Sequence, residues 1–142
     1  MSGTVLEAEE SQYLEAQRGW LKAHFPDNPE GRYATVEGKI DLIERILANG
    51  WITEGETRQY QALGVGFGDS LAQELGFVWV TVQDEHGRDP ALNWPGSSLL
   101  CFPATMISSR IEDGEKVDVR QLFAGLCETL NEAKTRAGAV VG

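Results

Sequence analysis

One short segment of the chain gathers the residue types that perform acid–base chemistry. Residues 83–96 read QDEHGRDPALNWPG, and Asp84, His86 and Asp89 lie close together within it. A histidine between carboxylates is a common set for proton transfer, provided that the side chains converge in a cleft. The tip of a β-hairpin has the same composition, because Gly87 can adopt the positive φ that a tight turn requires. Two interpretations therefore remain open, a catalytic loop and a polar turn.

The surrounding residues do not predict metal or cofactor chemistry. A calcium-binding EF-hand loop with Gly87 at its sixth position would begin at Val82, where a carboxylate is required. The chain has no HExxH sequence, and the other histidine, His24, is distant. The glycines of GVGFG, residues 64–68, precede a strand-like segment instead of following one, so they do not match a nucleotide-binding loop. We expect no metal and no cofactor.

Three further features are candidates for binding. Arg88 belongs to the segment described above, and Trp94 stands beside its Pro-Gly turn. An exposed tryptophan could anchor a partner, whereas a covered one would cap the sheet. Arg110 is followed by Glu112 and Asp113, and such an arginine either binds a carboxylate or phosphate ligand or orders its own loop. We predict the ordering role, through an ion pair with at least one nearby carboxylate: Asp69, Asp84, Glu112 or Asp113.

Size and charge bound the class of protein. The chain has 142 residues, which fits one domain spanning residues 1–142, and its formal net charge is -10. A negative field repels phosphate backbones, and the basic residues form no run, so no nucleic acid is expected as a partner. No apolar run has the length of a membrane span, and the N-terminus lacks the pattern of a signal peptide. We expect a cytoplasmic protein, no membrane contact, and an unknown protein or small molecule as partner, with a homodimer as another candidate assembly.

The cysteines point to the same compartment. Cys101 and Cys127 lie far apart and form no CxxC pair, so neither a zinc site nor a redox motif is predicted. Each lies in an apolar run, LLCF and GLCETL. We therefore expect both thiols to be buried and reduced.

Apolar spacing predicts three helices in the first half of the chain. The first covers about residues 6–25 and ends before the prolines that follow. The second runs from Val36 to Leu47, with Thr35 as its N-cap. The third opens with the capping box TEGE and continues to Gly76.

The periodicity changes to that of strands after Gly76. The segments FVWVTV, PALNW and SSLLCF predict an antiparallel meander, because their connections are short. A last helix begins at Asp118, which forms a capping-box-like pair with Gln121, and residues 137–142 are expected to fray. The order predicts an α+β fold with three N-terminal helices, a three-stranded antiparallel meander and a C-terminal helix packed on one sheet face.

Two glycines in the third helix need a structural reason. Gly64 and Gly68 lie one turn apart, and each costs about 1 kcal/mol of helix stability relative to alanine. We predict that another element, most simply a helix, packs closely against the strip that they leave bare.

The segments GDSLAQELGFVWVTVQDEHGRDPAL and FPATMISSRIEDGEKVDV, in this order and spacing, resemble a bacterial family of uncharacterised proteins, domain of unknown function 3806. The resemblance covers about residues 60–130. The matching elements are Gly68-Asp69, Leu75-Gly76, Trp79, Asp84, Gly87-Arg88-Asp89-Pro90, Pro103, Arg110 and Glu112-Asp113-Gly114. The resemblance implies a bacterial source and no established activity, and it therefore supplies no catalytic residues.

The sequence favours a non-catalytic binding or protein-interaction module. The alternative is a small hydrolase-like enzyme that uses the acidic and histidine side chains of residues 84–89. The two readings differ in one observable, because catalysis requires those side chains to converge in a pocket, whereas a hairpin tip directs them into water.

Overall fold

Helices and a single sheet make up the described part of the chain, which in the computed structural model comprises residues 3–24, 27–50, 57–85, 87–103, 107, 110, 118–135 and 140–141. The elements follow one another as β1 (Gly3–Val5), α1 (Ala8–Lys22), α2 (Pro29–Tyr33), α3 (Val36–Ala48), α4 (Thr57–Leu75), β2 (Val78–Asp84), β3 (Gly87–Asn93), β4 (Leu100–Cys101), α6 (Val119–Lys134) and β5 (Val140–Val141). The predicted α+β class is confirmed.

The sheet has the order β1-β2-β3-β4-β5. Strands β2, β3 and β4 form the predicted antiparallel meander, with Trp79 opposite Leu92 and Leu92 opposite Cys101. The two chain ends add an outer strand each, which the sequence did not predict. Strand β1 pairs antiparallel with β2, and β5 pairs in parallel with β4. The tail was predicted to fray, but its residues 140–141 are part of the sheet.

The helices cover one face of this sheet, as predicted. Trp79 and Thr81 point to that face, since they hydrogen-bond to side chains of α4 and α1. Alternation along a strand sends the intervening residues to the opposite face. There, a separate small apolar cluster is formed by Val80, Val82, Ala91 and Leu100.

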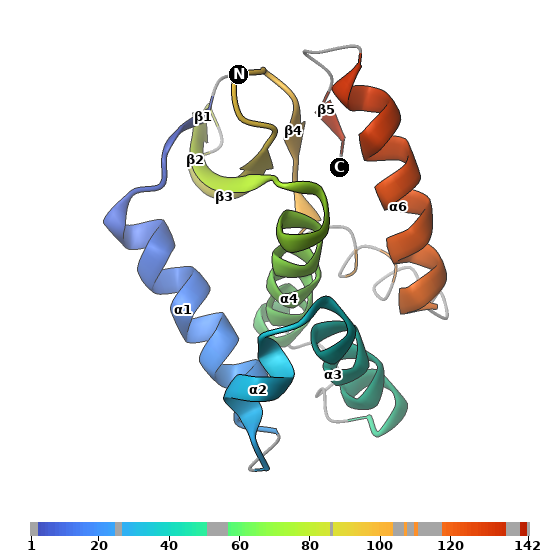
Figure 1. Cartoon of the computed structure of the whole chain (residues 1–142). Coiled ribbons are helices and arrows are strands. Elements are labelled where there is room, and N and C mark those ends of the chain that lie inside the picture. The colour runs from blue at the N-terminus through green and yellow to red at the C-terminus, as the bar shows by residue number, and fades with distance from the viewer. Residues whose placement is uncertain are drawn as a thin grey trace.

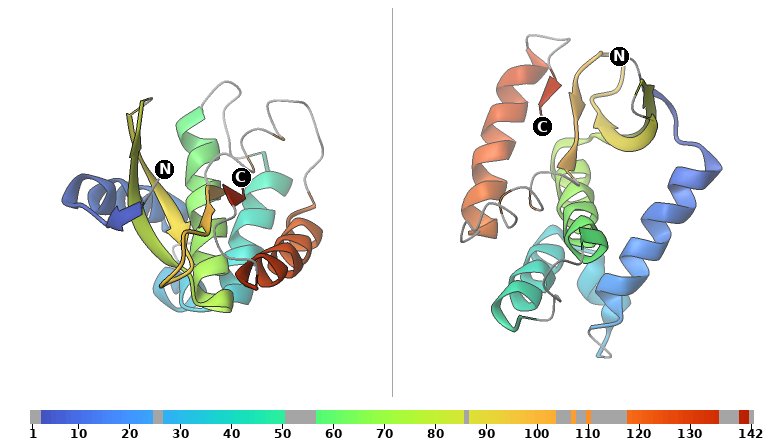
Figure 2. Two further views of the ribbon diagram at one scale, coloured as in Figure 1. Left: turned by 90° about the horizontal axis from the view of Figure 1, so that it is seen from above. Right: turned by 180° about the vertical axis from the view of Figure 1, so that it is seen from behind.

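Helix α4 is the centre of the molecule. Figure 1 and Figure 2 show it with α1 on one side and with α3 and α6 on the other. All residues from 62 to 68 are buried, so this part of the helix has no solvent-facing side. A helix enclosed in this way belongs to the core. Its neighbours in the largest apolar cluster include Leu21 of α1, Ile43 of α3, Leu92 of β3 and Leu130 of α6.

Local sequence signals explain most element boundaries. The Thr35 hydroxyl accepts a hydrogen bond from the Gly38 amide at 2.9 Å and caps α3. The Asp118 carboxylate likewise caps α6 by accepting from the Gln121 amide at 3.1 Å. Gly76 ends α4 with a φ of +79°, which side chains rarely adopt. The capping box predicted at residues 53–56 lies outside the described residues.

One short helix, which the sequence did not predict, appears at the prolines that follow α1. Helix α2 starts with Pro29 at its first position, where the missing amide hydrogen is no loss. Asn28 precedes it with a φ of 55°, and its side chain accepts a hydrogen bond from the Gly31 amide. Asn28 and Pro29 together therefore form a helix start.

The glycines of α4 admit close neighbours, as predicted. A Cβ at Gly68 would lie 2.6 Å from the Trp79 ring and 2.6 Å from Pro103, so a strand side chain and a proline fill the strip. The predicted close neighbour is present, and Pro103 is itself a helical residue. Two further helices contact Gly66, where a Cβ would lie 2.9 Å from Leu21 and 3.5 Å from Ile43. Gly64 is buried.

The cysteines differ in burial. Cys101 is fully buried, and burial raises the pKa of its thiol to about 12. Cys127 is only half-buried, so the prediction of two buried thiols holds for Cys101 alone. Neither forms a disulfide.

Candidate functional site

The segment that first suggested catalysis is a β-hairpin. Asp84 pairs with Gly87 at the end of the β2–β3 ladder, and Gly87 has the positive φ, 121°, that the turn interpretation required. Asp89 is exposed on β3, opposite Val82. His86 and the side chain of Asp84 lie outside the described residues, so the convergence that the enzyme alternative requires is not tested.

Arg88 joins this hairpin to the start of α1. Its guanidinium lies 2.6 Å from the Glu10 carboxylate and 3.7 Å from that of Glu9, and it also pairs with Glu7. Glu10 is 7% exposed and accepts a further hydrogen bond from the Thr81 hydroxyl at 3.0 Å. Burial alone would raise the pKa of Glu10, but the hydrogen bonds from Arg88 and Thr81 outweigh it and lower the pKa. The binding candidate Arg88 thus contacts carboxylates of its own chain.

Trp94 is covered on one side by α6. The Lys134 ammonium lies 3.9 Å from the centre of its ring, and Phe77 packs beside it with ring centres 5.7 Å apart. Lys134 also donates to the Leu75 carbonyl at 2.7 Å, at the C-terminal end of α4. Of the two readings of Trp94, the structure favours the one in which it caps the sheet.

The loop candidates lie largely outside the described part. Arg110 is half-buried, whereas Glu112 and Asp113 belong to the residues that the structure does not describe. The carboxylate of Asp69, another predicted partner, accepts hydrogen bonds from residues of α1, α2 and β2. The predicted ion pair of Arg110 stays a prediction.

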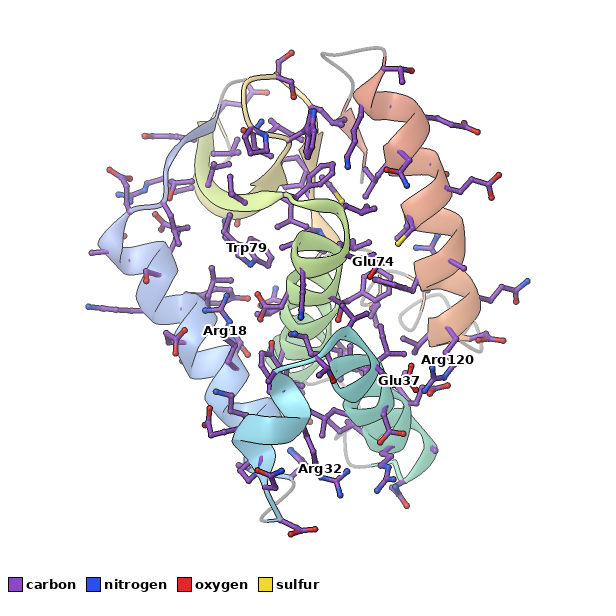
Figure 3. All side chains as sticks on the ribbon, in the orientation of Figure 1. Arg18, Arg32, Glu37, Glu74, Trp79 and Arg120 are labelled. Carbon is purple, nitrogen blue, oxygen red and sulfur yellow. The ribbon has the colours of Figure 1, made fainter. Side chains whose placement is uncertain are left out.

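Asp69, in the middle of α4, accepts hydrogen bonds from three other elements. Arg18 of α1 donates to both carboxylate oxygens, from Nε to Oδ2 and from Nη2 to Oδ1, at 2.7 Å each. The Trp79 indole of β2 donates to Oδ1 at 2.8 Å, and the Tyr33 hydroxyl of α2 donates to Oδ2. Figure 3 shows Arg18 and Trp79 reaching into the same region beside α4. We call these four residues the Asp69 junction.

The electrostatics of the Asp69 junction favour a fixed ion pair. Burial would raise the pKa of Asp69, but the hydrogen bonds from Arg18, Tyr33 and Trp79 outweigh it and lower the pKa. The same contacts act on the donors. The bond to Asp69 raises the pKa of Arg18, and burial together with the Asp69 charge raises that of Tyr33. The carboxylate therefore stays ionised, while the phenol stays protonated.

A second arginine, Arg120, ties α6 to α3. It forms paired hydrogen bonds to Glu37 at 2.7 and 2.9 Å and a further one to Glu44 at 2.7 Å. Figure 3 shows Arg120 beside Glu37 between the two helices. Unlike the Asp69 junction, this contact, which we call the Arg120 clamp, lies at the surface, with Arg120 45% and Glu37 75% exposed.

The buried polar side chains of the described residues have hydrogen-bond partners within the chain. No fully buried side-chain nitrogen or oxygen among them lacks a hydrogen-bond partner. No group of three or more histidine, cysteine or acidic residues within the same ranges could hold a metal ion. No helix in this part of the chain is both long and apolar enough to cross a membrane.

From the sequence, Asp69 was a predicted partner of Arg110 and, like Trp79, an element of the family resemblance. Its contacts with Arg18, Tyr33 and Trp79 were not predicted. One signal was available, since Asp69 falls between buried positions of an apolar helix, where an unpaired charge would be costly. The partners of Asp69 could not be predicted from the sequence, because they come from three different elements.

The fold and the Asp69 junction define an α+β domain whose central carboxylate is paired within the chain. A family model for a domain of unknown function (DUF3806) matches residues 39–123, which is more than half of the chain. The chain belongs to this family, as the resemblance predicted.

A solved structure shares the fold. A crystal structure of a protein from Bacteroides thetaiotaomicron VPI-5482 aligns with a TM-score of 0.68 and 16% identity. The match covers 89% of this chain and 47% of that one, so the chain spans about half the length of this neighbour. No curated protein matches the chain.

Proposed function

We propose that the protein is a non-catalytic binding or protein-interaction module. The observation that carries the proposal is the saturation of its buried polar groups. Asp69 accepts four hydrogen bonds, which leaves its carboxylate no role as a general base. A catalytic acid or base must be able to reach a substrate and exchange a proton with it. In this protein the Asp69 junction stabilises the fold instead.

The charge distribution favours a cationic partner. Arg18, Arg88 and Arg120 each contact more than one carboxylate of the same chain, while the net charge remains -10. The remaining negative field attracts positively charged surfaces and repels nucleic acid. It also opposes the approach of a second copy, so a homodimer ranks second. A cytoplasmic location is part of this proposal.

The fold of the neighbour supports a modular role. There the shared fold occupies 47% of a longer chain, which is the behaviour of a unit that combines with other segments.

Activity measurements separate the proposal from the enzyme alternative. Chromogenic ester and phosphomonoester substrates would be incubated with the parent and with the triple variant Asp84→Asn, His86→Gln, Asp89→Asn. We expect both proteins to match the buffer control. Turnover by the parent that the triple variant loses would overturn the proposal and assign the hairpin as a catalytic loop.

Peptide binding tests the cationic partner. A lysine-rich and a glutamate-rich peptide of equal length, each with a fluorescent label, would be titrated with the protein. We expect only the lysine-rich peptide to bind, with an affinity that falls as salt is added. Duplex DNA would be titrated in the same way. Equal binding of both peptides, or binding of DNA that is tighter than that of the lysine-rich peptide, would contradict the electrostatic argument.

A further inference from the structure

The side chain of Lys134 lies in a site whose groups all suit an ammonium ion. Its Nζ stands 3.9 Å from the centre of the Trp94 ring and 5.6 Å from that of Phe77. The centres of the two rings are 5.7 Å apart and their planes are tilted by 42°, so the rings form two walls beside the charge. The Leu75 carbonyl accepts a hydrogen bond from Nζ at 2.7 Å. We call the two rings and this carbonyl the ammonium site.

The ammonium site favours a cation through its own groups, whichever molecule supplies the charge. The face of an aromatic ring carries negative potential, and tryptophan binds cations best among the aromatic residues. Leu75 is the last residue of α4, so its carbonyl lies at the negative end of the helix dipole. Figure 1 shows that α4 and α6 both direct their C-terminal ends toward the sheet, so two helix ends of the same sign meet the site.

The ammonium site borders solvent. Gly76, directly after α4, is exposed, and Trp94 and Lys134 are only half-buried. A Cβ at Gly76 would lie 3.3 Å from the Trp94 ring, so the glycine leaves that part of the ring without a covering side chain. An ammonium group of another molecule therefore has a route to the ring once Lys134 moves aside.

The contacts that hold Lys134 are those of an exchangeable group. No carboxylate in the described part of the chain forms an ion pair with it, whereas Lys22 pairs with Glu30 at 3.1 Å. A cation–π contact at a half-exposed site contributes little to stability. Lys134 is also the last residue of α6, and the ends of helices fray. A cation that brings further contacts of its own can therefore compete with it.

We propose that the ammonium site binds a lysine side chain of a partner protein, which takes the place of Lys134. The proposal rests on the cationic partner inferred above and names the group that this partner inserts. Lys134 is then an internal competitor that keeps the site closed. Trp94 caps the sheet in the closed state and contacts the partner lysine in the open state. A primary ammonium fits best, because it supplies an N–H for the Leu75 carbonyl as well as a charge for the rings.

The first experiment tests the site without a partner. n-Butylamine, which is protonated near pH 7, would be titrated into the Lys134→Ala variant while the Trp94 indole N–H resonance is followed by NMR. We expect this resonance to shift, and to shift less with butyltrimethylammonium, which has no N–H to donate. 1-Butanol has a similar chain without the charge and should leave the resonance unchanged. Equal shifts with butylammonium and butanol, or none with either, would overturn the proposal.

The same titration of the parent covers the case in which Lys134→Ala does not fold. There butylammonium competes with Lys134, so we expect the Trp94 resonance to shift at higher concentrations than in the variant. Absence of any shift in the parent would then overturn the proposal.

The second experiment uses the labelled lysine-rich peptide. Removal of the internal competitor should strengthen its binding, and we expect Lys134→Ala to bind about two- to fivefold more tightly than the parent, as loss of a weak cation–π contact implies. Lys22→Ala is the matched control, because it removes the same charge from an ion pair on α1. Adding Trp94→Leu to Lys134→Ala should cancel the gain.

The outcomes separate this proposal from the one on which it rests. Equal gains in Lys134→Ala and Lys22→Ala would be an effect of net charge, which would overturn the ammonium site and leave the cationic partner in place. Absence of peptide binding by the parent and by every variant would overturn the cationic partner, and with it the role of the site, even where butylammonium shifts the Trp94 resonance.

Discussion

The Asp69 junction and the Arg120 clamp use the same chemistry at the same distance in different surroundings. Arg18 Nε lies 2.7 Å from Asp69, and Arg120 Nε lies 2.7 Å from Glu44. The side chains of the first pair are 20% and 10% exposed, whereas those of the second are 45% and 36% exposed. Water competes with the second pair and weakens it, so burial and not contact distance decides what each contributes.

The two regions also differ in how many elements they join. Asp69 connects α1, α2 and β2 to the central helix through one carboxylate. Arg120 connects only α6 to α3. Loss of Asp69 would leave a half-buried arginine, a phenol and an indole without this acceptor, whereas loss of Arg120 would return two carboxylates to water.

The largest expected effect is that of Asp69→Asn. Removing one partner of a buried ion pair is strongly destabilising, and we expect the free energy of unfolding to fall by about 3 kcal/mol in urea denaturation. The matched control is Asp89→Asn, which changes an exposed carboxylate and should stay within about 0.5 kcal/mol of the parent. The comparison between the two regions breaks down if these variants are equally stable.

The next effect comes from Gly68, which admits the Trp79 ring beside Asp69. We expect Gly68→Leu to destabilise by about 1–3 kcal/mol through overpacking, measured by urea denaturation. Gly68→Ala should show a smaller loss, because better helix propensity offsets about 1 kcal/mol of the clash.

Gly66→Ala is the control for this effect. Its new methyl group would meet the flexible end of Leu21 at 2.9 Å instead of a rigid ring, so its stability should exceed that of Gly68→Ala. The opposite order would show that the Trp79 ring moves more easily than the packing suggests.

Lowering the pH should remove the contribution of Asp69 to stability without a substitution, and this effect is smaller. The pKa of Asp69 is lowered in the folded protein, so the native state binds fewer protons than the unfolded state. Its contribution is complete above the unfolded value of about 3.9 and is lost as the pH falls through the folded pKa. Thermal unfolding followed from pH 6 to pH 2 should therefore show a steeper acid decline for the parent than for Asp69→Asn. Parallel curves would mean that Asp69 does not cause the decline.

The smallest expected effect is that of Arg120→Ala. Its partners are exposed, and surface ion pairs contribute little to stability. We expect the urea midpoint to remain near that of the parent, with a difference that shrinks as salt is added, because salt screens exposed ion pairs. A loss comparable to that of Asp69→Asn would show that exposure does not separate the two regions.

Local signals made much of the fold predictable. The apolar spacing of α3, its Thr35 cap, and the cap of α6 at Asp118 are encoded within a few residues. The meander was predictable for the same reason, since its strands are close in sequence. Strands β1 and β5 were not, because each is short and gains its partner only from a distant segment.

The candidate site was predicted less well than the fold. Residue type drew attention to the hairpin, where Arg88 was recognised as important but was expected to bind a ligand. The Asp69 junction depends on where four elements cross, and sequence spacing does not encode that crossing. A polar residue inside an apolar helical face was the one readable sign.

The pairing of both chain ends with the sheet has a consequence for self-association. Exposed strand edges are templates for pairing with other chains, and short outer strands limit this hazard. Here β1 (Gly3–Val5) and β5 (Val140–Val141) occupy the two outer positions. Trimming or extending either terminus therefore alters a sheet edge directly, and with it the tendency of the molecules to aggregate.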